Sequence, residues 1–436
     1  MGRCRSCARK KGAHRQRLFL FLAGCVLTAW PLCGQIVEIN PTISSTAAPL
    51  PADDTPTGNG LITSQLGENK GPFEYALHLS VRGAYDDNIS LSHMNRLDDY
   101  FIQIQPSLML GIGAVAKQET FLMVNYLPSF FRYDEHNEFD SNQHVIRVLA
   151  GYKTGNLILR LTQDVAILNN IVLAASSGER LSLVPTGRTD LNIFNTDLAA
   201  NYNMTPHDFI FSEFRMTRTE YAEPLVNSEV YAANFYLNHG FSQTLVLGLG
   251  VDGGYDAVDF PTPDQTFVRA NAHLNYTPSR QFGLDVIAGE EFRNFENIAR
   301  RTYTTPVFSI STTWLPCDST RVTLSATRQI YNSAAPTAQD YVDTSVNAMI
   351  RDRVCKQLYL TVIGGYEHVQ YFNAIDLPMP LPTLSDDYYY IQPSADILLT
   401  RYWSLGGYYL RRQNSGTVST VDFYSNEVGV RTVIKF

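Results

Sequence analysis

Apolar and polar side chains alternate along most of the chain after about residue 72. One run carries apolar residues at every second position: Leu245, Leu247, Leu249, Val251 and Tyr255. The positions between them hold small or polar residues: Gly248, Gly250, Asp252 and Asp256. Successive side chains of a β-strand point to opposite faces, so this period of two predicts strands with one apolar and one polar face. No helical period competes over a comparable length.

Breaks in the alternation divide residues 73–436 into about eighteen segments of roughly 10–15 residues. Short breaks, such as 153–156, alternate with long ones, such as 171–187. Tight turns at one end and longer loops at the other are typical of outer-membrane barrels, and this layout requires an even strand number. We therefore predict an all-β fold, a transmembrane antiparallel β-barrel of about eighteen strands, with sixteen as the alternative. Both termini are expected in the periplasm.

The end of the chain carries a second signal of this class. Val430, Ile434 and Phe436 alternate with polar or small residues, and the last residue is aromatic. Such an ending resembles bacterial outer-membrane β-barrel proteins, in which the terminal strand is read by the insertion machinery. The resemblance implies that Phe436, Ile434 and Val430 form the assembly signal and that the barrel-assembly machinery is a partner. The alternative is an edge strand of a soluble sheet.

The start of the chain predicts export. Residues 1–17 are basic and without acids, and an apolar run follows at residues 18–32. A basic stretch followed by a short apolar run is a secretory signal, too short for a membrane-spanning helix. We predict a signal peptide at 1–34, a flexible periplasmic linker at 35–72 and the barrel at 73–436, in the bacterial outer membrane. Leu22 to Cys25 also matches a lipobox, which leaves lipidation of Cys25 as an alternative.

Charge and motifs exclude several functions. The net charge of −8 makes nucleic acid an unsuitable partner, whereas outer-membrane lipid and lipopolysaccharide are the expected surroundings. The motifs of serine hydrolases, zinc proteases and phosphate-binding loops do not occur in the sequence. His273 is expected to face the lumen near acids, where it is more often plain lining than a catalytic group. We predict no enzymatic activity, no cofactor and no metal site.

The polar faces of the expected strands carry charges of both signs. These residues can pair across the wall or line a passage and set its selectivity, and rings of about 16–18 strands leave an aqueous interior. The predicted pore-lining residues are Arg82, Arg147, Arg160, Glu213, Arg215, Asp252, Arg269, Asn271, His273, Asp285, Arg351, Glu367, Asp396 and Arg431.

Two cysteines belong to the predicted barrel, Cys317 and Cys355, each in a short turn at the same rim. The turns are two strands apart, roughly 10 Å at the ordinary strand spacing. If the two turns lean together, their Cα atoms could come within the ~7 Å that a disulfide needs. The compartment is oxidising, so the bond would persist. A disulfide between them is therefore predicted, with two unpaired thiols as the alternative.

Two short strings indicate a family. Residues 83–89 read Gly-Ala-Tyr-Asp-Asp-Asn-Ile, residues 102–108 read Ile-Gln-Ile-Gln-Pro-Ser-Leu, and 391–394 repeat the Ile-Gln-Pro-Ser of the second. This pattern resembles the putative β-barrel porin 2 family, over 73–436. The acidic string 86–88 is interpreted as a strand-end turn that caps backbone groups, with a Ca²⁺ site as the alternative.

The resemblance implies an outer-membrane channel, and the family's association with surface polysaccharide systems suggests export components as partners. We predict a porin-like channel that passes small solutes or a surface polysaccharide strand. The alternative is a non-conducting structural or surface-attachment barrel whose lumen is blocked by a loop. The long, partly apolar loop at 171–187 is the candidate for folding inward.

Overall fold

The computed structural model describes residues 73–113, 119–172, 188–296, 302–336, 339–374, 384–417, 419 and 422–436. The predicted signal peptide (1–34) and linker (35–72) lie outside the described residues, as does most of the loop at 171–187 that was predicted to fold inward. In the described parts of the chain, no helix is long and apolar enough to cross a membrane.

The described residues form eighteen β-strands and a short 3-10 helix, η3 (Asn137–Phe139). The first nine strands are β1 (Phe73–Asp86), β2 (Asp99–Gly113), β3 (Phe121–Tyr133), β4 (Ser141–Thr154), β5 (Leu157–Val172), β6 (Arg188–Asn203), β7 (Asp208–Tyr221), β8 (Ser228–Ser242) and β9 (Leu245–Val258). The other nine are β10 (Gln265–Ser279), β11 (Phe282–Phe295), β12 (Thr302–Cys317), β13 (Thr320–Asn332), β14 (Gln339–Arg353), β15 (Leu358–Asn373), β16 (Ser385–Leu398), β17 (Trp403–Gly416) and β18 (Phe423–Lys435).

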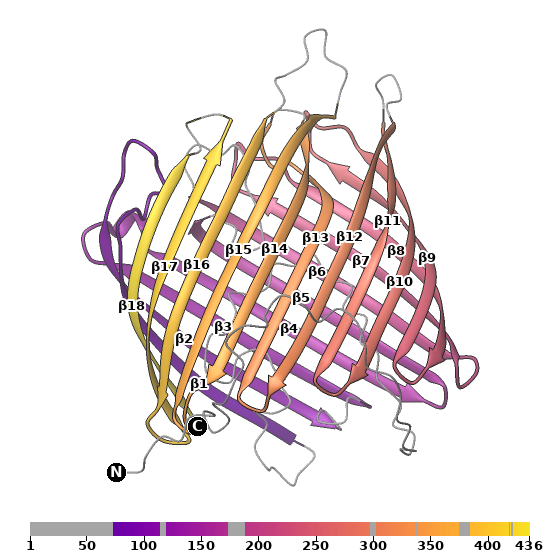
Figure 1. Cartoon of the computed structure of the whole chain (residues 1–436). Helices are drawn as coiled ribbons and strands as arrows, with labels where there is room; N and C mark the ends of the chain where they lie inside the picture. The colour runs from indigo at the N-terminus through magenta and orange to yellow at the C-terminus, as the bar shows by residue number, and fades with distance from the viewer. Residues whose placement is uncertain are drawn as a thin grey trace, which may run out of the picture.

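Each strand pairs antiparallel with the next along the chain, and β1 pairs with β18, so the sheet closes into a ring (Figure 1). Closure matters in lipid because an open sheet edge would leave backbone N–H and C=O groups without hydrogen bonds. The predicted all-β, antiparallel barrel is confirmed, and its strand number is eighteen rather than the alternative of sixteen.

The two rims of the barrel differ in the length of their connections. At one rim the connections are short, for example 155–156, 243–244 and 318–319. We call this the turn rim; it also holds the end of β18 and the C-terminus (Figure 1). The opposite loop rim carries longer connections, such as 87–98 between β1 and β2. This asymmetry is the one that the spacing of the breaks predicts.

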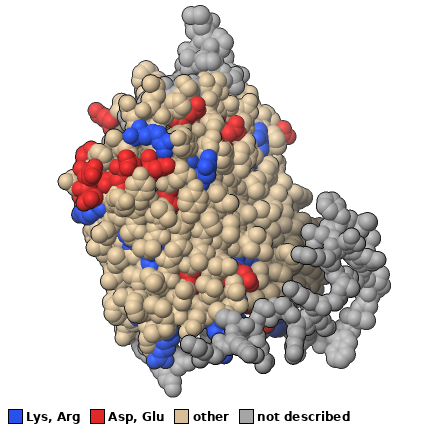
Figure 2. All heavy atoms as spheres, turned by 60° about the vertical axis from the view of Figure 1, so that its left-hand side comes forward, with Lys and Arg blue, Asp and Glu red and all other residues tan. Residues whose placement is uncertain are grey.

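The alternation of the sequence separates an outer from an inner face. Apolar side chains on the outer face are exposed, such as Leu249 at 73% and Val430 at 62%. On the other face polar side chains are buried among their neighbours, and Gln265 and Glu291 are 0% exposed. On the side shown in Figure 2, charged side chains are few in the middle of the outer wall and gather toward its ends. An apolar band with charges at its margins is the surface that a bilayer requires.

The ladder between β12 and β13 stops short of the loop rim. Pairing between β12 and β13 runs from the turn rim only as far as Phe308 and Arg328, and above that level the two strands part (Figure 1). Pro306 lies just beyond the last pair and has no N–H to donate. The side chain of Arg328 donates to the carbonyl oxygen of Pro306 at 3.1 Å, so this edge of β12 faces β13. Proline is confined to such edges of a sheet because it interrupts the ladder.

Above the parting, the ends of β13, β14 and β15 bend into the barrel as one unit. Their mutual pairing continues to Asn332, Gln339 and Asn373. Lower down, even-numbered side chains of these strands face outward, for example Val346, which is 42% exposed. Near the loop rim, even-numbered side chains contact the inner wall instead: Phe372 stacks on Tyr303 of β12 with ring centroids 4.0 Å apart. We call residues 329–336, 339–343 and 369–374 the inward fold.

Candidate functional site in the barrel lumen

All fourteen residues predicted to line the pore lie on the inner face of the wall. Each has the strand parity of the buried polar residues and the opposite parity to the exposed apolar ones. Strand alternation alone therefore places these side chains. The structure adds their partners, because most of them are tied into ion pairs and hydrogen bonds with residues of neighbouring strands.

Ion pairs join adjacent strands around the inner wall. Arg147 on β4 binds Asp164 on β5 through two hydrogen bonds of 2.6 and 2.9 Å. Such a forked contact fixes the geometry of both groups, because a guanidinium matches the two carboxylate oxygens. The side chain of Arg147 is still 31% exposed, so the pair meets the water of the lumen. The charge of Arg147 therefore faces the lumen.

A second group lies on β6, β7 and β8. Arg215 donates to Asp197 at 2.7 Å and to Glu213 at 3.0 Å, and Asn234 also donates to Glu213 at 3.0 Å. Two carboxylates surround one guanidinium here, so this stretch of wall carries an excess negative charge. The signs of the predicted lining residues are thus arranged in local clusters rather than in one ring.

The pair between Arg431 and Asp396 passes over an intervening strand. Arg431 lies on β18 and Asp396 on β16, and their two hydrogen bonds measure 2.8 and 3.1 Å. Gly406 of β17 stands between them in register with both residues. A Cβ at Gly406 would lie 2.0 Å from the Oδ1 atom of Asp396, so only glycine leaves room for the carboxylate. The pair thereby links three strands through a space that glycine keeps open.

His273 is buried in a hydrogen-bonded group on β8 to β11. Its Nδ1 atom lies 2.8 Å from the side-chain oxygen of Asn238, and its Nε2 atom 3.1 Å from Asp285. Both ring nitrogens make hydrogen bonds and His273 is 4% exposed, so the arrangement stabilises the barrel wall. Asn271 donates to Asp252 at 2.8 Å and to the Tyr236 hydroxyl at 2.9 Å in the same group. In the described part of the chain, no His, Cys, Asp and Glu side chains are grouped to hold a metal ion.

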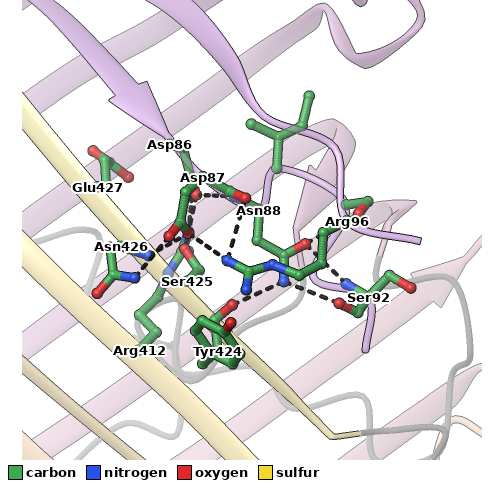
Figure 3. Close-up of polar contacts among 12 residues, drawn as sticks. Asp86, Asp87, Asn88, Ser92, Arg96, Arg412, Tyr424, Ser425, Asn426 and Glu427 are labelled. Atoms are coloured by element: carbon green, nitrogen blue, oxygen red, sulfur yellow. Dashed lines mark hydrogen bonds and ion pairs between the residues drawn. The ribbon is translucent and has the colours of Figure 1, made fainter. Parts of the chain in front are cut away.

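The acidic string at the end of β1 fastens the closure of the barrel. Asp86 accepts hydrogen bonds from Arg412 of β17 at 2.7 Å and from Ser425 of β18 at 2.8 Å (Figure 3). Asp87 accepts at 2.7 Å from the side chain of Asn426 and at 2.8 Å from its backbone N–H. The two acids therefore join the first strand to the last two.

Asn88 completes this closure by holding the loop that follows. Its side chain donates to the carbonyl oxygen of Tyr424 at 2.8 Å and accepts from the backbone N–H of Ser92 at 3.1 Å (Figure 3). Its own N–H donates to Asp86 at 2.9 Å. The predicted capping of backbone groups by residues 86–88 is confirmed.

A polar interface holds the inward fold against the wall of β9 to β11. Gln265 donates to Asp340 of the fold at 2.7 Å, and Asn332 of the fold donates to Asp256 of β9 at 2.6 Å. Arg293 donates to Gln265 at 2.8 Å. We call these five residues the polar interface; Gln265 and Asp340 are both 0% exposed.

Charges from the wall extend this interface. Glu291 accepts from Arg293 and from Arg269, each at 2.7 Å, and Arg293 lies 3.6 Å from Asp256. At the tip of the fold, the backbone N–H of Val226, between β7 and β8, donates to the carbonyl oxygen of Ala334 at 2.8 Å. The fold therefore lies against the inner wall from β12 to the loop between β7 and β8 and narrows the lumen near the loop rim.

The sequence analysis missed this fold, and Asp256, Gln265, Asn332 and Asp340 were not among its site residues. Their partners are far apart in the chain; Gln265 and Asp340 are separated by 75 positions. Pro306 alone was not a sufficient signal, because Pro106 and Pro393 also lie within strands and pairing resumes beyond them. The loop at 171–187, predicted to fold inward, lies largely outside the described residues.

The predicted disulfide is not made: Cys317 and Cys355, both in the described part of the chain, are not bonded to each other. Cys317 pairs with Thr320 across its own two-residue turn. Its Sγ atom stays at that turn, 3.2 Å from the Ser319 hydroxyl and 3.1 Å from the Thr320 hydroxyl. The prediction failed because it allowed two tight turns to lean together, whereas each is held by its own strands.

A family model described as "Putative beta-barrel porin 2" matches residues 181–436. The chain belongs to this family. The match includes the string at 391–394 and leaves out those at 83–89 and 102–108, so it is narrower than the resemblance suggested. Membership makes the chain a porin-type β-barrel of the outer membrane. No curated protein matches the chain.

The comparison with solved structures gives matches of low identity. OccAB3 of Acinetobacter baumannii is 10% identical, with a TM-score of 0.43, and covers 83% of this chain and 99% of its own. OpdK of Pseudomonas aeruginosa is 11% identical, with a TM-score of 0.40 and coverages of 83% and 99%. OccK2 of the same organism, in complex with glucuronate, is 10% identical, with a TM-score of 0.43 and coverages of 83% and 98%.

Proposed function

We propose that this porin-family barrel is a passive channel for small polar solutes across the outer membrane. The observation that carries the proposal is the inner wall, where charged side chains such as Arg147 keep part of their surface open to the lumen. A wall built only for stability would gain little from charges left in contact with water, because exposed ion pairs contribute about 0–1 kcal/mol. Charged groups that face a water-filled passage set its ion preference.

Ion selectivity in planar bilayers tests this proposal. Purified protein is expected to give discrete current steps, and Arg147→Ala should shift the preference toward cations because Asp164 then keeps its charge without a counter-ion. Val148→Ala, on the outer face of the same strand, is the matched control and should leave selectivity unchanged. Folded barrel that gives no steps in any variant would refute the channel.

A non-conducting barrel is the second candidate, and the inward fold is the observation that favours it. A loop that permanently filled the passage would leave a structural or surface-attachment protein. Replacing residues 331–341 by a short Gly-Ser turn separates the two cases. A channel is expected to conduct before and after this change, whereas a blocked barrel would conduct only after it.

Passage of a surface polysaccharide strand is the finer proposal, with polysaccharide-export components as partners and lipopolysaccharide around the outer wall. It rests on family membership and on the partly exposed rings of Phe131 and Tyr390 on the inner wall. Liposome swelling with oligosaccharides of increasing length tests it. Uptake that ends at disaccharides would restrict the channel to small solutes.

A further inference from the structure

Water can replace the side-chain hydrogen bonds that join the inward fold to the wall. Asn332, Asp340, Asp256 and Gln265 meet through side-chain hydrogen bonds. Phe372 adds aromatic contacts with Tyr303 and Phe295 of the wall. Water replaces a protein hydrogen bond with little net loss, so separating a polar interface costs far less than exposing an apolar one of equal area. The interface is therefore suited to opening.

The parting of β12 and β13 frees the fold to move. Above Arg328 the fold has no ladder with β12, so swinging it breaks no pairing on that side. On the other side, residues 369 and 370 of the fold stay paired with β16, and the N–H of Tyr371 donates to the carbonyl oxygen of Leu384 at 2.9 Å, so the fold stays joined to β16 when it swings. The three strand ends remain paired with one another. They can move as a unit about the level of Arg328, whose guanidinium also donates to Thr344 at 2.7 Å.

The interface buries more negative than positive charge. The charged groups facing it are Asp256 on β9, Asp264 on the connection to β10, Arg269 on β10, Glu291 and Arg293 on β11, and Asp340 on β14. Three buried acids, Glu291, Asp256 and Asp340, face two arginines. Glu291 binds both Arg269 and Arg293, and Asp256 lies 3.6 Å from Arg293. One oxygen of Asp256 and one of Asp340 are buried and accept no hydrogen bond within the described chain. A proton on this acid pair removes the excess charge.

We propose that the inward fold is a gate for the channel proposed above and that Asp256 and Asp340 make it pH-sensitive. In the closed state both acids are buried, and one proton on the pair offsets the excess negative charge. In the open state both are hydrated, and the proton is released. Because the closed state binds more protons, raising the pH shifts the gate toward the open state, by up to about tenfold in the closed-to-open ratio per pH unit for one proton.

A reversible tether tests the gate. The backbones of Val226 and Ala334 are hydrogen-bonded, so Val226→Cys with Ala334→Cys places two thiols within reach of a disulfide. The variant is made with Cys317→Ser and Cys355→Ser to exclude other bonds, and each single cysteine is a control. In planar bilayers the oxidised tether is expected to hold conductance at its low level at about pH 5 and about pH 8. Dithiothreitol should restore the rise in conductance with pH.

Asp340→Asn tests the charge. The amide oxygen still accepts from Gln265, while the excess negative charge is gone, so the gate is expected to stay closed at both pH values. Asp352→Asn on the same strand, near the turn rim, should behave as wild type. A conductance that is the same with the tether oxidised or reduced would overturn the gate and leave the channel standing. Absence of conductance from folded wild type, reduced tether and Asp340→Asn at every pH would overturn the channel itself.

Discussion

Replacing Leu249 by arginine probes whether the outer face lies in hydrocarbon. Leu249 is the most exposed leucine of β9, at 73%, and points away from the lumen. Toward the loop rim, outward-facing Tyr255 lies beside Thr266, and toward the turn rim Tyr276 lies beside Leu245. Aromatic residues at these two levels are placed as the interfacial girdles of a membrane barrel are.

The strand geometry sets the depth of the substitution. From Leu245 to Tyr255 is ten residues, which at ~3.4 Å per residue and a tilt of ~40° spans about 26 Å, close to the ~25 Å apolar band of such barrels. Leu249 lies near the middle of that span. An arginine at the midplane costs about 2–4 kcal/mol of folding free energy, or roughly 30- to 800-fold in the folding equilibrium constant.

Reversible urea unfolding from phospholipid vesicles, followed by tryptophan fluorescence, measures this cost. Thr266→Arg is the matched control, because it places the same side chain on the outer face at the level of Tyr255. There the expected cost is only about 0–1 kcal/mol. The reasoning is refuted if Leu249→Arg unfolds with the free energy of wild type, or if both variants lose the same amount.

Three further predictions concern single residues. Gly406→Ala should lower the unfolding free energy by about 1–3 kcal/mol because its Cβ displaces Asp396, whereas Gly407→Ala, whose Cβ meets nothing nearer than 3.8 Å, should match wild type; equal losses would contradict this. Phe436→Ala should reduce the amount of heat-modifiable barrel in outer membranes, and unchanged abundance would count against the assembly signal. Cys317→Ser should leave stability unchanged under oxidising conditions, whereas a loss of about 2–4 kcal/mol would indicate that a disulfide does form.

The faces of the strands could be predicted from sequence because strand alternation is local. Leu249 and Val430 point outward and Arg147 points inward by parity alone, whatever the partner strands are. The strand number followed from turns that interrupt the alternation. What parity could not reveal is packing. Asn271 faces inward, yet it is 7% exposed, and its side chain lies where a Cβ on Gly289 would stand.

The inward fold could not be predicted because its cause and its contacts are not local. Parity puts Asp340 and Phe372 on the outer face, and the bend of the strand ends carries them to the inner wall. That bend depends on where a ladder stops and on partners across the lumen. The disulfide prediction failed for a related reason. It considered only the distance between the two turns, whereas Cys317 is held in its own turn by pairing with Thr320.

The parting at Pro306 also has a mechanical consequence. A ring in which every strand is hydrogen-bonded to both neighbours resists a change of circumference, because widening it anywhere must stretch a ladder. Here the ladder between β12 and β13 ends at Phe308 and Arg328, so beyond that level, toward the loop rim, this joint carries no such resistance. The barrel is therefore stiff near its turn rim and compliant near its loop rim. A solute wider than the resting passage would be accommodated first at this seam.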